Sequence, residues 1–130
     1  MQKFNWLLAI SMLFLVVAAC QPAAPQEPET GPAVIKDIKV NFVDMEPPVV
    51  MAVITCPMPY ICTVVDELKT ERSDENVINI TLTITSTPGR NCPKTEAFLI
   101  VQNVDLGSDF VSGQTYTINV NDKTTTFVME

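Results

Sequence analysis

The sequence predicts an all-β fold, an antiparallel β-sandwich of about seven short strands that begins near Val34. From this residue onward apolar residues recur with a period of two, which is the period of a strand, rather than 3.6. The alternating runs are short, and turn sequences that contain Pro, Gly, Asn or Asp separate them. No segment of this region carries a convincing helical pattern.

The first half of the predicted domain contains three of these strands. Residues 34–42 alternate, so that one face of the strand is apolar apart from a single lysine. Residues 49–55 are a nearly continuous apolar run, which predicts a strand buried on both faces. Residues 63–70 form the third strand, before a polar turn at 72–76. The shared face of the first strand consists of Val34, Lys36, Ile38, Val40 and Phe42.

The second half shows the clearest alternation, in residues 77–85, where apolar residues alternate with Asn and Thr. Further strands are expected at 96–104, 114–120 and 123–128. Asn121 and Asp122 should join the last two strands as a tight turn, because both residue types tolerate a positive φ. We expect the core to include Val40, Phe42, Ile80, Leu82, Ile84, Ile118 and Val120.

The N-terminus has the pattern of a removable export signal: Lys3, an apolar run over residues 6–17, and two alanines before Cys20. The apolar run is shorter than the roughly 20 residues that a bilayer-spanning helix needs. The block from Val17 to Cys20, VAAC, resembles a bacterial lipobox, in which the signal is cut before the cysteine and the cysteine carries acyl chains. The resemblance implies lipidation of Cys20 and a place in the cell envelope, on the outer membrane or on the outer face of the cytoplasmic membrane.

A proline-rich segment separates Cys20 from the predicted domain. Residues 21–32 contain four prolines, which fix φ and remove backbone donors, so we expect an extended, semi-rigid spacer. At about 3.1 Å per residue this spacer would reach roughly 35–40 Å. The expected organisation is therefore a signal peptide at 1–19, a lipidated cysteine and linker at 20–33, and a β-sandwich domain at 34–130.

The predicted domain also resembles small immunoglobulin-like domains of bacterial lipoproteins. The matching features are Cys62-Thr63 followed by Asp66, Cys92 after a Thr-rich strand, and the closing segment 112–121. The resemblance implies an immunoglobulin-like antiparallel sandwich, and it brings no activity with it.

If Cys20 carries lipid, three cysteines remain, and an exported protein is then expected to hold one disulfide and one free thiol. In the chain-entropy model the longer closure, Cys62 with Cys92, contributes about 3.6 kcal/mol. The shorter one, Cys56 with Cys62, contributes about 2.2 kcal/mol. These values favour Cys62–Cys92 and leave the shorter pairing open. Cys56 ends an apolar strand, so we expect it to be a small buried hydrophobe.

Composition narrows the function classes. The chain has 15 acidic and 8 basic residues and no His, so it lacks a basic stripe for nucleic acid and the commonest general base and metal ligand. It also contains no nucleophile elbow, phosphate loop or zinc-ligand spacing. We therefore expect no enzymatic activity, no cofactor and no nucleic-acid partner. The densest acidic cluster is expected to be a solvated edge and comprises Asp66, Glu67, Glu71, Asp74 and Glu75.

Two functions remain. The first is a membrane-tethered, non-enzymatic binding or structural module whose partner is an envelope or extracellular protein. Its candidate binding loop is Pro57-Met58-Pro59-Tyr60, in which two prolines stiffen a Met and a Tyr that are expected to be exposed. The competing interpretation is that this segment is only a corner of the sandwich. The alternative is periplasmic copper or redox handling through Cys56, Met58 and Cys62, because soft sulfur ligands suit Cu(I).

Overall fold

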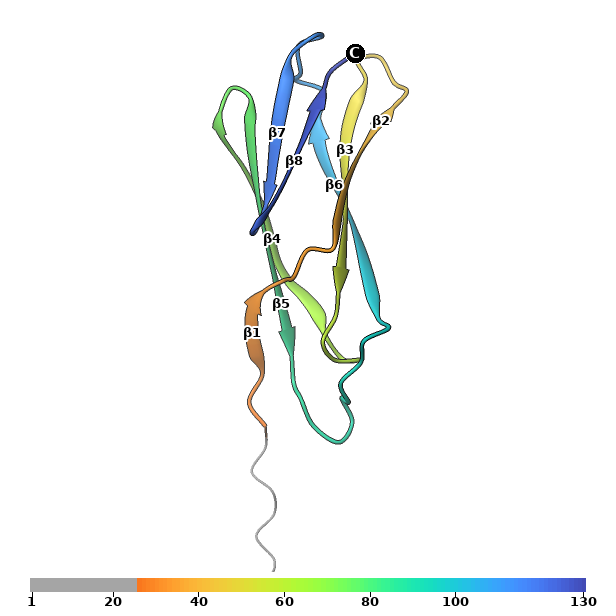
Figure 1. Cartoon of the computed structure of the whole chain (residues 1–130), viewed down its shortest axis with the longest axis vertical. Coiled ribbons are helices and arrows are strands. Elements are labelled where there is room, and N and C mark those ends of the chain that lie inside the picture. Colours follow the sequence, from red (N-terminus) through yellow and green to blue (C-terminus); the bar gives the residue numbers. More distant parts are fainter. Residues whose placement is uncertain (1–25) are drawn as a thin grey trace, which may run out of the picture.

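A computed structural model describes residues 26–130, which form eight strands in two facing sheets and contain no helix within that range (Figure 1). The predicted all-β class and sandwich architecture are therefore confirmed. Cys20, the predicted signal peptide and the first part of the predicted linker lie outside the described residues. The strands are β1 (Glu29–Pro32), β2 (Asp37–Val43), β3 (Val49–Pro57), β4 (Val64–Asp74), β5 (Val77–Ser86), β6 (Leu99–Gly107), β7 (Thr115–Val120) and β8 (Lys123–Val128).

The larger sheet has the order β4-β5-β7-β8, and β1 shares one edge of β5 with β7. β7 pairs with the first half of β5, from Val77 to Ile80, and β1 pairs with its last four residues, from Thr83 to Ser86. The smaller sheet has the order β2-β3-β6. All pairings are antiparallel, as predicted, except β5 with β7, which is parallel.

The core lies between the two sheets and is built from the alternating faces of β3, β5 and β7. Five of the seven residues predicted for the core are buried: Ile80, Leu82, Ile84, Ile118 and Val120. Val40 is half-buried and packs against this core, which agrees with the prediction. Phe42 is a wrong prediction, because it lies near the end of β2, at the rim of the sandwich, and is 46% exposed.

The predicted first strand differs from the structure in its start and its face. β2 begins at Asp37, and the preceding residues 33–36 cross from the larger sheet to the smaller one (Figure 1). In this crossing segment Ala33 and Ile35 are buried, whereas Val34 is 65% exposed. The next buried residue is Ile38, so burial shifts from odd-numbered to even-numbered residues within this segment. Contrary to the prediction, Val34 and Ile38 therefore do not lie on one face of one strand.

β3 is the central strand of the smaller sheet, but it is not buried on both faces as its apolar run predicts. Val50, Ala52, Ile54 and Cys56 face the core and are fully buried, whereas the residues between them are half-buried. No layer of residues 26–130 covers the outer face of this sheet. The apolar residues on the outer face of β3 are therefore half-buried only because β2 and β6 lie on either side of this strand.

Four residues expected in the linker form a strand instead. Glu29–Pro32 pairs antiparallel with β5, with Glu29 opposite Ser86 and Pro32 opposite Thr83. Proline is tolerated there because β1 is a short edge strand, in which a missing N–H removes no bond from a central ladder. The folded domain therefore begins before Val34, and the predicted boundary between linker and domain is wrong at these four residues.

Candidate functional site

The predicted binding loop is a corner of the sandwich. Pro57 is the last residue of β3, and Met58, which was expected to be exposed, is 1% exposed and belongs to the core. Only Pro59 is exposed, and Tyr60 is half-buried. The prediction of a stiff loop that presents Met58 is therefore wrong, because the alternation of β3 continues through this residue and turns its side chain inward.

Backbone hydrogen bonds attach this corner to the segment before β6. Met58 N–H donates to the carbonyl of Phe98 at 2.8 Å, Thr95 N–H to that of Pro59 at 3.0 Å, and Ile61 N–H to that of Pro93 at 3.1 Å. These bonds hold residues 93–98 against the corner, and β6 accordingly starts at Leu99 rather than at the predicted residue 96. The corner therefore has a structural role: it fixes the segment before β6 against the end of β3.

Cys62 and Cys92 form a disulfide, with their Cα atoms 5.3 Å apart, as loop entropy favoured. The bond joins the residue shortly before β4 to the loop between β5 and β6. It lies next to the hydrogen-bonded corner, so one end of the sandwich is held by both covalent and backbone links.

The three sulfur atoms of the copper hypothesis, those of Cys56, Met58 and Cys62, are not all available as metal ligands. Cys56 is the remaining free cysteine of the described residues and is fully buried, as predicted. Met58 is buried on the same face of the chain, and the Cys62 sulfur is bonded to Cys92. Burial also raises the pKa of the Cys56 thiol, which disfavours the thiolate that a metal would need. Residues 26–130 contain no group of three His, Cys, Asp or Glu side chains placed to hold a metal ion.

Asn121 has a role that the sequence did not reveal. Its φ is 51°, which confirms the tight turn between β7 and β8. Its side chain also fills the gap between β7 and β1 along the edge of β5. The Asn121 Oδ1 accepts from Leu82 N–H at 3.0 Å, and its Nδ2 donates to the carbonyls of Leu82 at 2.9 Å and Ala33 at 2.8 Å. The amide thus replaces a peptide group in the sheet, at the point where β1 ends.

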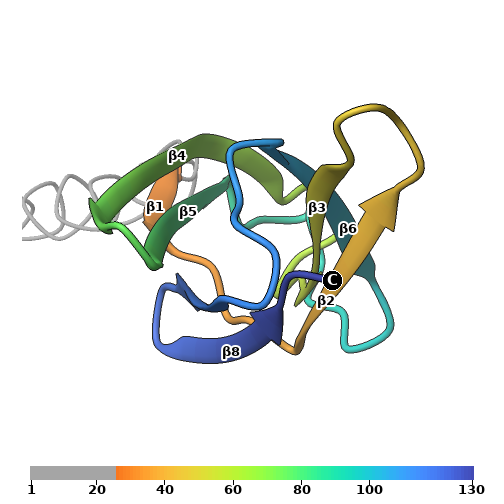
Figure 2. The ribbon, with the colours of Figure 1, turned by 90° about the horizontal axis from the view of Figure 1, so that it is seen from above.

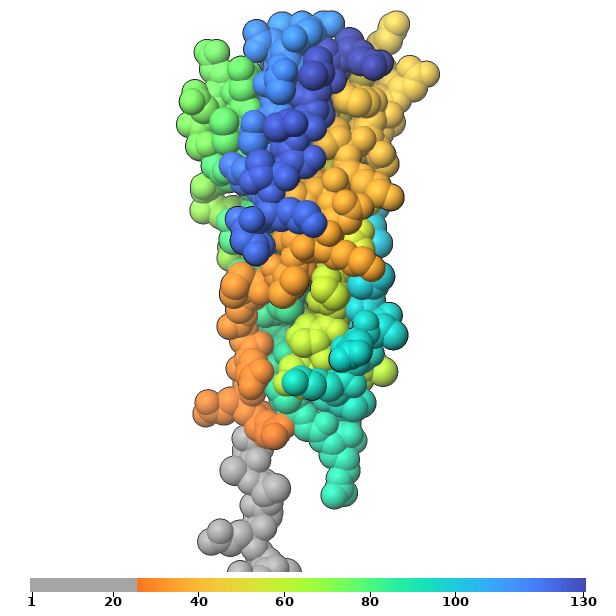
Figure 3. Space-filling view, in the orientation of Figure 1, coloured from red at the N-terminus to blue at the C-terminus, as the bar shows by residue number. Residues whose placement is uncertain are grey.

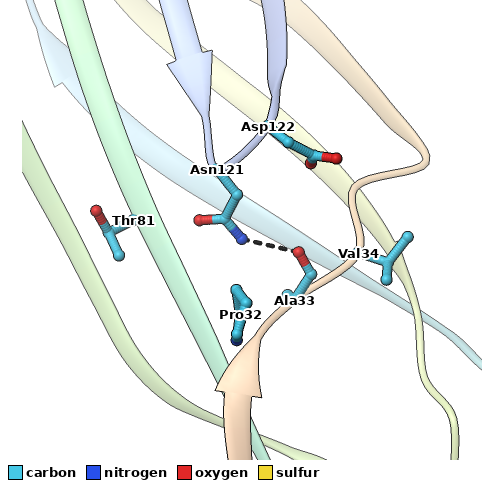
Figure 4. A pocket seen from close by; sticks show the side chains of 6 residues that line it. All are labelled: Pro32, Ala33, Val34, Thr81, Asn121 and Asp122. Carbon is cyan, nitrogen blue, oxygen red and sulfur yellow. Dashed lines mark hydrogen bonds between the residues drawn. The ribbon is translucent and has the colours of Figure 1, made fainter.

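An open hollow of about 490 Å³ lies over this amide (Figure 4). Its walls are Pro32, Ala33, Val34, Thr81, Asn121 and Asp122. The Asn121 amide already bonds the backbone, and the hollow holds no pairing of a nucleophile with a base. The hollow lies at the junction between the N-terminal strand and the larger sheet.

The acidic cluster follows the exposed edge strand β4 and the turn after it, as predicted for a solvated edge. Lys69 Nζ lies 2.6 Å from the Glu71 carboxylate, and Thr83 Oγ1 donates to Asp66 at 3.4 Å. Arg72, also on β4, packs against the loop before β7. Its guanidinium lies 4.6 Å from the centre of the Phe110 ring and donates to the Asp109 carbonyl at 3.0 Å.

Within residues 26–130 the chain offers no helix of the length and apolarity needed to cross a bilayer. No curated protein and no solved structure matches the sequence. The model of the ORF11 beta-sandwich domain family matches residues 52–129, which run from the middle of β3 to the residue after β8. This match covers more than half of the chain and agrees with its two facing sheets, so the protein belongs to the ORF11 beta-sandwich domain family.

Proposed function

We propose that this protein is a lipid-anchored lipoprotein of the cell envelope that acts as a non-enzymatic binding or structural module. The anchor is Cys20, on the outer membrane or on the outer face of the cytoplasmic membrane, and the partner is an envelope or extracellular protein. The sequence from Val17 to Cys20 motivates the anchor. The Cys62–Cys92 disulfide supports an exported protein, because disulfides persist in oxidising compartments.

The observation that carries the proposal is how the N-terminal segment joins the sandwich. The chain enters β1 toward one end of the elongated domain, and loops 44–48 and 108–114 lie at the opposite end (Figure 1). The β1 ladder and the Asn121 side chain fasten this segment to β5. An anchor just before β1 would therefore attach the domain to the membrane by one end, with its long axis pointing away from the membrane. The sides and the far end of the domain would be free to contact a partner.

The experiment is metabolic labelling with an alkyne fatty acid, followed by fractionation and mass spectrometry of the purified protein. We expect label on an N-terminal Cys20 and retention in the membrane fraction. Cys20→Ala should abolish both label and retention, whereas Cys56→Ala, the matched control, should leave both intact. An intact N-terminus upstream of Cys20, or membrane retention that survives Cys20→Ala, would reject the proposal.

A further inference from the structure

The two sheets differ in width. The larger sheet is four strands wide, from β4 to β8, whereas the smaller sheet has three strands. On one side β2 lies beside β8 (Figures 2 and 3). The rings of Phe42 and Phe127 are 6.0 Å apart between these two strands. This side of the sandwich is closed. The missing strand position is therefore on the other side, next to β6 and opposite β4.

The burial of β4 agrees with a missing neighbour. Residues paired across an antiparallel ladder point to the same face, so Leu68 shares the core face with its partner Leu82, and Thr70 shares it with Ile80. Leu82 and Ile80 are 0% and 2% exposed, but Leu68 is 36% exposed and Thr70 is also exposed. The core face thus continues onto β4 without a cover.

The free edge of β6 carries few of the features that protect an edge strand, and its one bulge lies at the end of the strand, between Asp105 and Gly107. β4 carries six charged residues, which discourage pairing with another chain, whereas the nine residues of β6 contain one charge, Asp105, and no proline. Leu99 and Val101 on this strand are 42% and 54% exposed. β6 is therefore a long, nearly uncharged edge beside an uncovered part of the core face.

The direction of the free backbone groups of β6 follows from the hydrogen bonds at its start. Phe98 accepts from Met58, so its carbonyl faces the β3 side. Backbone groups of alternate residues in a strand point to the same side. Ile100 and Gln102 therefore face β3, and Leu99, Val101 and Asn103 direct their N–H and C=O groups to the free edge.

We infer that an extended segment of a partner protein adds to β6 as a fourth strand of the smaller sheet and covers the core face of β4. The segment needs about six residues without proline, with apolar side chains at alternate positions to pack on Leu68 and Val65. The loop around Asp109 already covers β4 beyond Arg72 and limits the site at that end.

The geometry favours a different protein over a second copy. Antiparallel pairing of two β6 strands in one continuous sheet reverses one domain relative to the other, which would place the two β1 entry points at opposite ends. Two chains anchored in one membrane cannot readily adopt this arrangement. This choice of occupant rests on the proposed anchor, whereas the strand site itself does not.

The test uses the full chain, purified as the cell processes it in a non-ionic detergent, and the peptide acetyl-Thr-Val-Thr-Val-Thr-Val-Thr-amide as the probe. Nuclear magnetic resonance should show saturable shifts of the amides of residues 99–105 and of Leu68. Val101→Pro removes one free-edge donor without removing a bond to β3, and should weaken binding at least tenfold. Its matched control, Val101→Thr, keeps the donor and should bind within twofold of the parent.

A second pair of variants tests the side-chain contact independently of the backbone. Leu68→Ser should weaken binding at least threefold, whereas Val128→Ser, at an exposed valine of β8 on the closed side, should not. Shifts that do not saturate, shifts centred on β2 or β8, or equal binding by Val101→Pro and Val101→Thr would each overturn the inference. A dimer that Val101→Pro dissociates would instead assign the edge to a second copy. If the Cys20→Ala experiment rejected the lipid anchor, the binding of the peptide to β6 would be unaffected, so the two proposals can fail separately.

Discussion

Leu82 and Thr83 are adjacent residues of β5 that lie on opposite faces of the sheet. Leu82 is fully buried, and Leu82→Ala should cost about 2–5 kcal/mol of unfolding free energy, from lost apolar burial and the cavity left behind. Thr83 is half-buried, and its hydroxyl makes only a long bond to Asp66, so Thr83→Ala should cost less than about 1 kcal/mol. Urea unfolding of both variants measures the difference. Equal losses would contradict the face assignment.

Cys56 is a second single residue with a testable effect, because its thiol makes the free energy of unfolding depend on pH. Burial raises its pKa, so the folded chain keeps the thiol proton at a pH where the unfolded chain has lost it. The stabilisation is complete below the unfolded pKa of about 8.5 and is lost as the pH rises through the folded pKa. Cys56→Ala should therefore flatten the fall in unfolding free energy above about pH 8.5. An unchanged slope in urea titrations at several pH values would contradict this expectation.

At the scale of elements, Asn121 joins three strands through one side chain. Asn121→Ala removes its bonds to Leu82 and Ala33 and leaves Leu82 N–H without a partner, at an expected cost of about 1–3 kcal/mol. Asn121→Gly also removes the bonds but suits the positive φ, so it should cost less than Asn121→Ala. Asp122→Ala is the control and should be nearly neutral. Amide hydrogen exchange should show β1 opening first in both Asn121 variants, and unchanged exchange in β1 would refute its role there.

The elements that the sequence predicted well are those whose alternation is set locally. β5, β7 and β8 match their expected ranges within one residue. In β5 and β7 apolar residues alternate with Asn and Thr, and β8 follows β7 directly through the two-residue turn at Asn121 and Asp122. The errors are at Val34, Met58 and Glu29, where position depends on distant partners. Residues 33–36 change sheets, the β3 alternation runs past Pro57, and β1 exists only because β7 leaves half of one β5 edge free. The free edge of β6 could not be predicted either, since it depends on how many strands each sheet has.

For the whole molecule, the two ends of the sandwich are held by different forces. The far end is held by the rings of Phe42, Phe110, Tyr116 and Phe127, with neighbouring centroids 4.8 to 6.0 Å apart. The end near β1 depends on the Cys62–Cys92 disulfide and on the hydrogen bonds of the corner. Breaking the disulfide should therefore affect the near end selectively.

Cys62→Ser and Cys92→Ser should each lower the unfolding free energy by about 2–5 kcal/mol, because the unfolded chain regains the entropy of the closed loop. Cys56→Ala should leave the disulfide intact, which peptide mapping without reductant can verify. In the Cys→Ser variants, amide exchange should accelerate first at residues 57–63 and 92–98, while Tyr116 and Phe127 stay protected until global unfolding. The near end contains both β1 and the start of β6. Breaking the disulfide should therefore also weaken the binding of the peptide probe to β6. Uniform acceleration at both ends would show instead that the disulfide acts only on the unfolded state.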